Sequence, residues 1–149
     1  MKSIIKIVFL ISLFSLFVIP TKDSAEELKI SEMSTKEQVW YFSDLYNVDY
    51  KLIDKIIECE SKYNNDVCSD GGRSCGVAQF QKPTFNELSK KMGEDLDYYS
   101  EYDQVKLLTW SVSNGYGKRW TAYRAIQNDG VYSFYSKQLK QHFTAYCKL

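Results

Sequence analysis

The residue best suited to acid–base chemistry is Glu60, near the end of an amphipathic run over residues 52–61. The apolar residues of this run recur at helical spacing: Ile53, Ile56 and Ile57. At about 100° per residue, Glu60 falls on their side of the predicted helix, whereas Glu58 points nearly the opposite way. Burial raises the pKa of a carboxyl group, so Glu60 would hold its proton near neutral pH, as a general acid must. The alternative is a glutamate that turns to solvent or pairs with Lys62.

The segment that follows can place a loop beside this helix. From Asn64 onward the chain is polar and contains glycine, and Asp70-Gly71 is a strong turn signal. We expect at most a small β-hairpin near residues 67–78. Asn64, Asp66 and Asp70 offer oxygen ligands that would suit calcium, but the alternating ligands and closing glutamate of an EF-hand loop are missing.

Helices are predicted along most of the remaining chain, and they would give Glu60 a rigid support. Ser34 and Glu37 have the spacing of a capping box, and Asp49 is a good N-cap for the helix that carries Glu60. Four further helices are expected: from Thr84 (with Glu87 at capping-box spacing), around Trp110, over residues 120–126 and over residues 131–146. The last would carry Phe134, Tyr135, Leu139 and Phe143. Three aromatic residues are expected in the core: Trp40, Trp110 and Phe143. The fold class predicted is mostly α.

The chain has 149 residues, enough for one compact domain and not for two. It begins like a secretory signal, with lysines before an apolar run over residues 7–19, then Pro20 and polar residues up to Ala25. Cleavage after Ala25 would divide the chain into a signal peptide (1–25) and a domain (26–149). An uncleaved anchor is the less favoured alternative, because the run is short for a membrane span. We therefore expect an exported protein, periplasmic or extracellular, with no stable membrane span after cleavage.

The charge of the chain argues against nucleic acid as a ligand, and its cysteine content indicates disulfides and not a zinc site. Without residues 1–25, sixteen basic and eighteen acidic residues remain, so there is no positive field to hold nucleic acid. All four cysteines lie in the exported part, and their even number predicts two disulfides. Of the three connectivities, we predict Cys68–Cys75 and Cys59–Cys147. A zinc site is disfavoured, because the chain has one histidine and no Cys-x-x-Cys pair.

Several of these segments form an ordered set: Glu60-Ser61, the loop over residues 69–76, Gly76-Val77-Ala78-Gln79 and Pro83-Thr84. The set resembles the soluble lytic transglycosylase (SLT) domain of the lysozyme-like superfamily. In that family a Glu-Ser pair ends a helix, a loop leads to Gly-Leu-Met-Gln, and Tyr-Asn-Ala-Gly lies at a later helix end. Ser113-Asn114-Gly115 resembles the last element, with serine in place of the tyrosine. The resemblance covers roughly residues 52–126.

The resemblance implies a disulfide-stabilised, lysozyme-like domain that cleaves the β-1,4 bond between N-acetylmuramic acid (MurNAc) and N-acetylglucosamine (GlcNAc) in peptidoglycan. Glu60 would be the single acid and base, the substrate acetamido group would assist, and products would carry 1,6-anhydroMurNAc ends. Gln79 and Asn114 would bind the sugar. Ser61 and Ser74 would not contact the sugar but would hold the residues of the site in position. Independently of the resemblance, four aromatic residues that flank loops are further candidates to stack on a sugar ring: Tyr63, Phe80, Tyr116 and Trp120. No metal or organic cofactor is expected.

Three alternatives remain open at this point. A hydrolytic muramidase on the same scaffold would use water, held by Asp66 or Asp70. A non-catalytic cell-wall-binding or secretion-assembly protein would need no acid at position 60. A small secreted helical protein without an enzymatic role is the third.

The expected partners are peptidoglycan glycan strands. A secretion or conjugation apparatus is left open as a further partner. We expect the protein to be a monomer.

Overall fold

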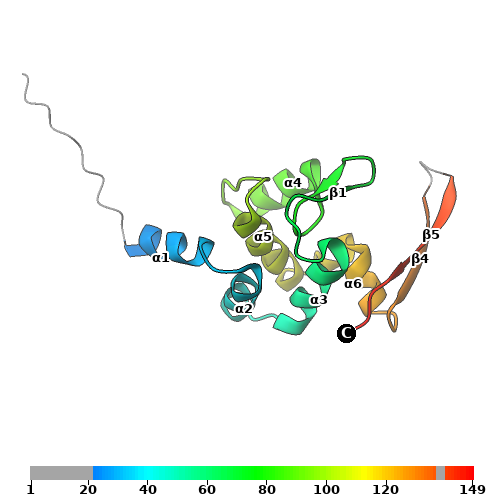
Figure 1. The fold of residues 1–149 in the computed structure, drawn as a ribbon, viewed down its shortest axis with the longest axis horizontal. Coiled ribbons are helices and arrows are strands. Elements are labelled where there is room, and N and C mark those ends of the chain that lie inside the picture. The colour runs from blue at the N-terminus through cyan, green and yellow to red at the C-terminus, as the bar shows by residue number, and fades with distance from the viewer. Residues whose placement is uncertain (1–21, 137–139) are drawn as a thin grey trace, which may run out of the picture.

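Helix α3 (Tyr50–Ser61) carries Glu60 and contacts both α2 (Thr35–Leu45) and α6 (Thr121–Ile126) in the computed structural model (Figure 1). The structure describes residues 22–136 and 140–149. Its other helices are α1 (Lys22–Ser31), α4 (Lys82–Met92), α5 (Glu101–Ser113) and the short 3-10 helix η1 (Gly117–Arg119). Its strands are β1 (Cys68–Ser69), β2 (Ser74–Cys75), β3 (Phe80–Gln81), β4 (Val131–Ser136) and β5 (Gln141–Tyr146). The predicted fold class, mostly α, is confirmed.

Local capping sets where helices α2 and α3 begin. The Ser34 hydroxyl accepts a hydrogen bond from the Glu37 backbone N at 3.4 Å, and the Glu37 carboxylate accepts one from the Ser34 backbone N at 2.9 Å. The Asp49 carboxylate accepts a bond from the Lys51 backbone N at 3.0 Å. Both predicted caps are therefore present. They stabilise the first turns and so fix the residue at which each helix begins.

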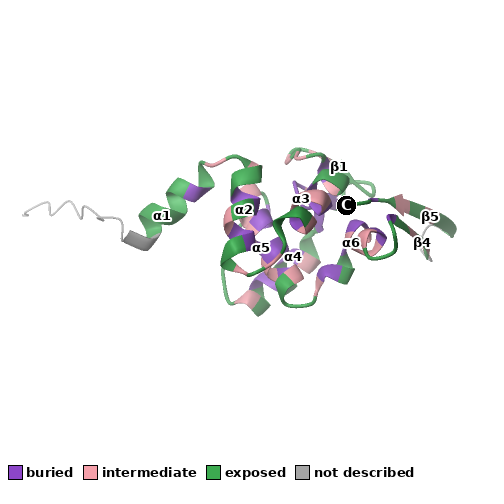
Figure 2. Cartoon of the chain, turned by 90° about the horizontal axis from the view of Figure 1, so that it is seen from below, coloured by how far each residue is buried: buried purple, intermediate pink, exposed green. Residues whose placement is uncertain are grey.

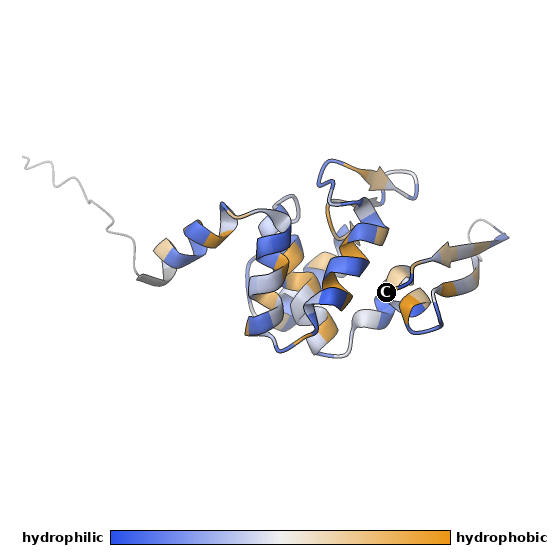
Figure 3. Ribbon diagram, turned by 60° about the horizontal axis from the view of Figure 1, so that its bottom comes forward, coloured by the Kyte–Doolittle hydropathy of each residue, from blue (hydrophilic) through white to orange (hydrophobic). Residues whose placement is uncertain are grey.

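The core lies where the long helices meet, and Figure 2 shows the buried residues gathered there. The three isoleucines of α3 are fully buried, as predicted: Ile53, Ile56 and Ile57. Apolar and polar residues alternate along the helices (Figure 3).

The prediction that Trp40 lies in the core was wrong, because its side chain is 63% exposed. On α2 the inward side carries Val39 and Phe42, and Trp40 lies roughly 160° from Phe42 around the helix. Trp110 and Phe143 are only partly buried.

The polar loop after α3 folds into a three-stranded antiparallel sheet in the order β1-β2-β3. Asp70 and Gly71 form the turn between β1 and β2, with positive φ angles of 54° and 68°. The sheet extends to Gln81 and so reaches beyond the small hairpin predicted over residues 67–78. From there the chain enters α4 at Lys82, two residues before Thr84.

The capping box predicted for α4 is not used. No side chain caps this helix, and its N-cap is Gln81. Pro83 lies in the first turn of α4. The first N–H groups of a helix have no partner within it, so a proline at this position costs no hydrogen bond. Thr84 therefore lies inside the helix and not at its boundary.

Strands β4 and β5 pair antiparallel as a β-hairpin, and the prediction of a closing helix over residues 131–146 was wrong. The spacing of Tyr135, Leu139 and Phe143 by four residues is helical, but alternation along β4 prevails: Tyr132 and Phe134 are partly buried while their neighbours are exposed. Aromatic residues favour strands when they can pack across a pair, and Phe134 stands opposite Phe143. Leu139 lies outside the described residues.

Two disulfides connect these elements in the pairs predicted from the sequence. Cys68–Cys75 joins β1 to β2 across seven residues. Cys59–Cys147 joins α3 to the residue after β5 across 88 residues. The second bond therefore ties the hairpin, and not the predicted closing helix, to the residue directly before Glu60.

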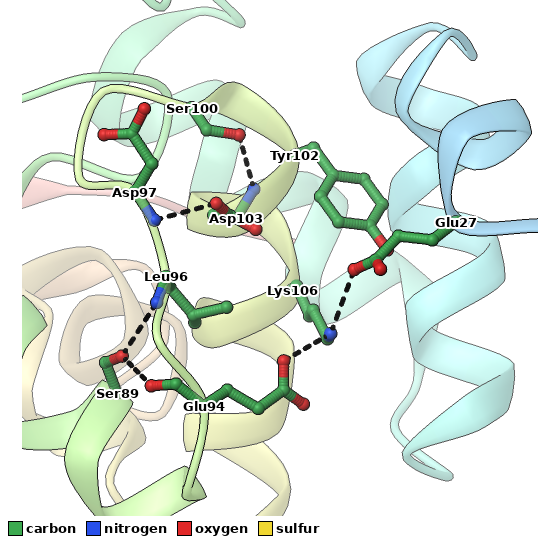
Figure 4. Close-up of polar contacts among 9 residues, drawn as sticks. All are labelled: Glu27, Ser89, Glu94, Leu96, Asp97, Ser100, Tyr102, Asp103 and Lys106. Carbon is green, nitrogen blue, oxygen red and sulfur yellow. Dashed lines mark hydrogen bonds and ion pairs between the residues drawn. The ribbon is translucent and has the colours of Figure 1, made fainter. Parts of the chain in front are cut away.

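Helix α1 is joined to the core by charged and polar contacts with α5 (Figure 4). Lys106 of α5 lies 3.7 Å from the Glu27 carboxylate and also pairs with Glu94. The Tyr102 hydroxyl donates to Glu27 at 3.3 Å. The predicted signal peptide lies outside the described residues except for residues 22–25, at the start of α1. None of the helices that the structure describes is long and apolar enough to cross a membrane.

The two disulfides should contribute unequally to stability, because a longer closed loop restricts the unfolded chain more. Replacing Cys59 and Cys147 together by alanine should lower the free energy of unfolding by about 4–5 kcal/mol, and replacing Cys68 and Cys75 by about 2–3 kcal/mol. Denaturant unfolding of the two double variants measures both losses. A larger loss for the Cys68/Cys75 pair would contradict this ranking.

Candidate active site

A cavity of about 570 Å³ opens beside Glu60. Besides Glu60, its lining comes from the β1–β3 sheet with its loops, from Thr84 of α4, from η1, Trp120 and α6, and from the β4–β5 hairpin. Cavities of this size are typical of small-ligand sites. Elements far apart in the sequence therefore converge on one carboxyl group.

Glu60 is partly buried, with its carboxyl group at the start of α6. Its Oε1 accepts a hydrogen bond from the backbone N–H of Ala122 at 3.3 Å. Burial raises the pKa of Glu60 to about 7, the Ala122 bond opposes the rise, and the charge of Asp70 adds to it. Near neutral pH the carboxyl is therefore present in both protonation states, as suits a group that gives a proton and takes one back.

The raised pKa of Glu60 also couples its protonation to folding. The unfolded chain loses this proton near the ordinary value of 4.5, whereas the folded chain keeps it until about 7. The stability that comes from the neutral, buried carboxyl is fully present below pH 4.5 and is lost as the pH rises through about 7. The site therefore disfavours the ionised form that the unfolded chain adopts freely.

Glu58 shows what the same residue type does on the outer side of α3. It is exposed, and its Oε2 lies 2.7 Å from Lys55 Nζ. The hydrogen bond from Lys55 lowers the pKa of Glu58. Two glutamates that are two residues apart thus have opposite pKa shifts, because the helix turns one toward the cavity and the other toward solvent.

The loop beside Glu60 is held from behind by Gln104, a residue that the sequence analysis did not identify. Gln104 is 1% exposed on α5. Its Oε1 accepts from the Ala78 backbone N at 3.0 Å, and its Nε2 donates to the Tyr98 carbonyl at 2.8 Å. Gln104 comes four residues before the buried Leu108, so a polar residue on an apolar stripe was the available signal, as it was for Glu60.

Gly76 allows this close approach of loop and helix. Its φ is +84°, and a Cβ atom there would lie 2.0 Å from Gln104 Nε2. Trp120 adds a second tie, since its indole Nε1 donates to the Ala78 carbonyl at 2.8 Å. The glycine that begins Gly76-Val77-Ala78-Gln79 is therefore required by packing as well as by backbone conformation.

Gln79 lines the cavity, but its amide is engaged within the loop. Its Nε2 donates to the carbonyls of Val67 at 2.9 Å and Gly76 at 2.8 Å. Its Oε1 accepts from the Ser69 hydroxyl at 2.6 Å. Both amide donors thus hold the loop in shape. A direct contact of Gln79 with substrate stays a prediction.

The other predicted site residues divide between the cavity and its surroundings. Phe80 and Ser74 line the cavity. Phe80 is buried and packs edge-on against Trp120, whereas the Ser74 hydroxyl donates to the Asp70 carboxylate at 2.9 Å. Ser61 is buried outside the lining, and its hydroxyl donates to a carbonyl of its own helix.

Asn114 and Tyr116 are not among the residues that line the cavity. Asn114 is the C-cap of α5, and its Nδ2 donates to the Trp110 carbonyl at 2.9 Å. The Tyr116 ring stacks on Trp110 with centroids 6.0 Å apart. Both side chains therefore have local partners at the end of α5, and their predicted binding of substrate stays a prediction.

Three arginines also line the cavity, and the sequence analysis named none of them: Arg73, Arg119 and Arg124. Arg119 makes two hydrogen bonds to the Glu87 carboxylate, at 3.0 and 2.8 Å. Arg124 donates to the Tyr132 hydroxyl at 2.9 Å. Arg73 donates from Nε to the Asp70 carbonyl at 2.9 Å. Among the residues described, no group of three histidine, cysteine or acidic side chains is placed to hold a metal ion.

Comparison with known families agrees with this arrangement. The family described as the transglycosylase SLT domain matches residues 40–125. The matched region includes Glu60, the β1–β3 sheet and most of α6, and it ends before the β4–β5 hairpin. A search of curated proteins found no match.

Gly76→Ala should destabilise the fold by about 3 kcal/mol or more, because the new Cβ atom would collide with the buried Gln104 in addition to the backbone strain. Gly72→Ala is the matched control. Its φ is +85°, but nothing lies within 4 Å of the added atom, so we expect a loss of about 1 kcal/mol. Denaturant unfolding compares the two. Equal losses would show that the approach of Gln104 is not what requires the glycine.

Proposed function

Because the chain belongs to the transglycosylase SLT domain family, we propose that it cleaves the MurNAc–GlcNAc β-1,4 bond of peptidoglycan without water, with Glu60 as its acid and base. The family itself implies peptidoglycan cleavage of the lytic transglycosylase type. The observation that carries the finer proposal is the Glu60 carboxyl at the cavity, with a pKa raised to about 7 by burial.

The first step would break the glycosidic bond. Protonated Glu60 gives its proton to the bridging oxygen, the bond from that oxygen to C1 of MurNAc breaks, and GlcNAc leaves with a hydroxyl group. The oxygen of the 2-acetamido group of MurNAc supports the positive charge that develops at C1. One carboxyl group is sufficient for this step, since the substrate supplies the second stabilising group.

The second step would return the proton to Glu60. The ionised carboxylate takes the proton of the C6 hydroxyl, O6 bonds to C1, and the acetamido oxygen withdraws. The product is a 1,6-anhydroMurNAc end, and no water is consumed. Between the two steps the negative charge lies on Glu60, where the backbone N–H of Ala122 stabilises it.

The cavity and the chain's other features support a polymeric sugar substrate. Its lining mixes a buried aromatic floor at Phe80 and Trp120 with polar side chains, the composition usual for ligand sites that must fix orientation. The two disulfides and the family match are consistent with an exported cell-wall enzyme.

A hydrolytic muramidase is the second candidate, and Asp70 is the observation that favours it. Asp70 lines the same cavity, and its charge contributes to the raised pKa of Glu60. A carboxylate in that position would suit a base that activates water. Against this role, the Asp70 carboxylate accepts a bond from Ser74 and belongs to the β1–β2 turn. The chemical nature of the product ends separates the two candidates.

Glu60→Gln should reduce the cleavage of purified peptidoglycan by at least about 10²–10⁴-fold, because glutamine neither gives nor takes the proton. Glu58→Gln, on the exposed side of the same helix, should retain native activity. Mass spectrometry of the soluble products should find 1,6-anhydro ends, lighter by one water than reducing ends. Near-native cleavage by Glu60→Gln would show that Glu60 is not the catalytic acid and base. Reducing ends from the native protein would make it a muramidase with Glu60 still as the acid.

A further inference from the structure

The β4–β5 hairpin lies beyond the residues that match the family, yet it reaches the cavity that contains Glu60. The match ends at residue 125, and β4 begins at Val131. Three hairpin residues nevertheless contribute to the lining: Phe134, Ser136 and Phe143. The hairpin is seen beyond α6, at the opposite end of the molecule from α1 (Figure 1). The chain therefore adds a wall to the site from outside the matched domain.

The base of this hairpin is fixed to the two helices that position Glu60. The Cys59–Cys147 disulfide ties the end of β5 to α3, at the residue directly before Glu60. The backbone N of Gly130, just before β4, donates to the Ala125 carbonyl of α6 at 2.8 Å. The Cys147 backbone N donates to the Gly130 carbonyl at 2.9 Å and closes the base of the hairpin. Such fixed points hold a binding wall in place better than a free loop would.

A side-chain contact with α6 fixes the orientation of the same hairpin face. Arg124 of α6 donates to the Tyr132 hydroxyl at 2.9 Å and lies over its ring, 5.0 Å from the centroid. Tyr132 in turn stacks against Phe134 with centroids 5.9 Å apart. The aromatic face that begins at Tyr132 is therefore directed by a residue that itself lines the cavity.

Phe134 and Phe143 are placed differently from the other aromatic residues of the cavity. They face each other across the strand pair, and their rings stack with centroids 5.6 Å apart. The other two aromatic lining residues, Phe80 and Trp120, belong to the hydrophobic core, whereas Phe134 and Phe143 neither belong to it nor pack against it. Both are partly buried and both line the cavity. Their remaining apolar surface therefore meets the space in which a ligand would lie.

We propose that Phe134 and Phe143 form an aromatic wall on which a sugar ring of the glycan strand packs while the strand lies across Glu60. This inference rests on the proposed function and adds a specificity-determining element to it. One face of a pyranose ring presents C–H groups, which pack flat against the face of an aromatic ring. Two rigid phenyl rings offer this area at low conformational cost, because each has only two side-chain torsions.

The test measures binding apart from cleavage. In a Glu60→Gln background, isothermal titration with the tetrasaccharide (GlcNAc–MurNAc)₂ gives the dissociation constant. Adding Phe134→Ala or Phe143→Ala should raise that constant about ten-fold, since the packing of an aromatic face is lost. Phe134→Leu keeps an apolar side chain but not the flat ring, and it should also lose most of the affinity. In the otherwise native enzyme, the same substitutions should raise KM more than they lower kcat.

Tyr135→Ala is the matched control within the same hairpin. Tyr135 is 50% exposed, does not line the cavity, and packs against His142 on the other side of the strand pair. It should leave the dissociation constant unchanged. Far-UV circular dichroism and thermal midpoints identify a variant that fails to fold, and Phe134→Leu then carries the test.

The outcomes separate this inference from the proposed function. Unchanged tetrasaccharide binding in folded variants of Phe134 and Phe143 would overturn the aromatic wall, even if the native protein cleaves peptidoglycan. Binding that depends on Phe134 and Phe143, in a native protein that does not cleave, would support the wall and overturn the proposed function. A Tyr135→Ala loss equal to that of Phe134→Ala would also overturn the wall, because the effect would then belong to the hairpin as a whole.

Discussion

The structure depends on the burial of one carboxyl group, that of Glu60, at the end of a helix that also buries three isoleucines. An ionised carboxylate is strongly disfavoured in such a place, so the group keeps its proton to a higher pH than usual. One backbone N–H, from Ala122, keeps the ionised form accessible. Desolvation, opposed by this hydrogen bond and reinforced by the charge of Asp70, raises the pKa of Glu60 to about 7.

Other contacts of the fold keep Glu60 and the neighbouring loop in this arrangement. The Ile53, Ile56 and Ile57 side chains set the rotation of α3 about its axis. Gln104 and Trp120 fasten the loop of the β1–β3 sheet from behind, so that it borders the cavity without collapsing into it. The buried amide of Gln104 has hydrogen-bond partners on both its oxygen and its nitrogen, which is the condition under which a buried polar group adds rigidity at little cost.

What could be predicted from the sequence was mostly local. The inward side of α3, its Asp49 cap and the Asp70-Gly71 turn follow from periodicity and backbone chemistry within a few residues. The hairpin could not be predicted in the same way, because the spacing of Tyr135, Leu139 and Phe143 also suits a helix. Only tertiary facts decide the matter: the pairing of Phe134 with Phe143 and the disulfide to Cys59. Gln79 illustrates another limit, since its position at the cavity was predictable but the engagement of its amide within the loop was not.

Titration of Glu60 is the decisive test of whether burial keeps this carboxyl protonated near neutral pH. Carbon-13 NMR of the side-chain carboxyl groups, from pH 3 to pH 9, reports each glutamate separately, and Glu60→Gln assigns the signal. Burial of Glu60 predicts a midpoint near pH 7 for this residue, with Glu58 below the ordinary value of 4.5 in the same spectra. A Glu60 midpoint near 4.5 would mean that the carboxyl is solvated, and would contradict the claim that burial prepares it to act as an acid.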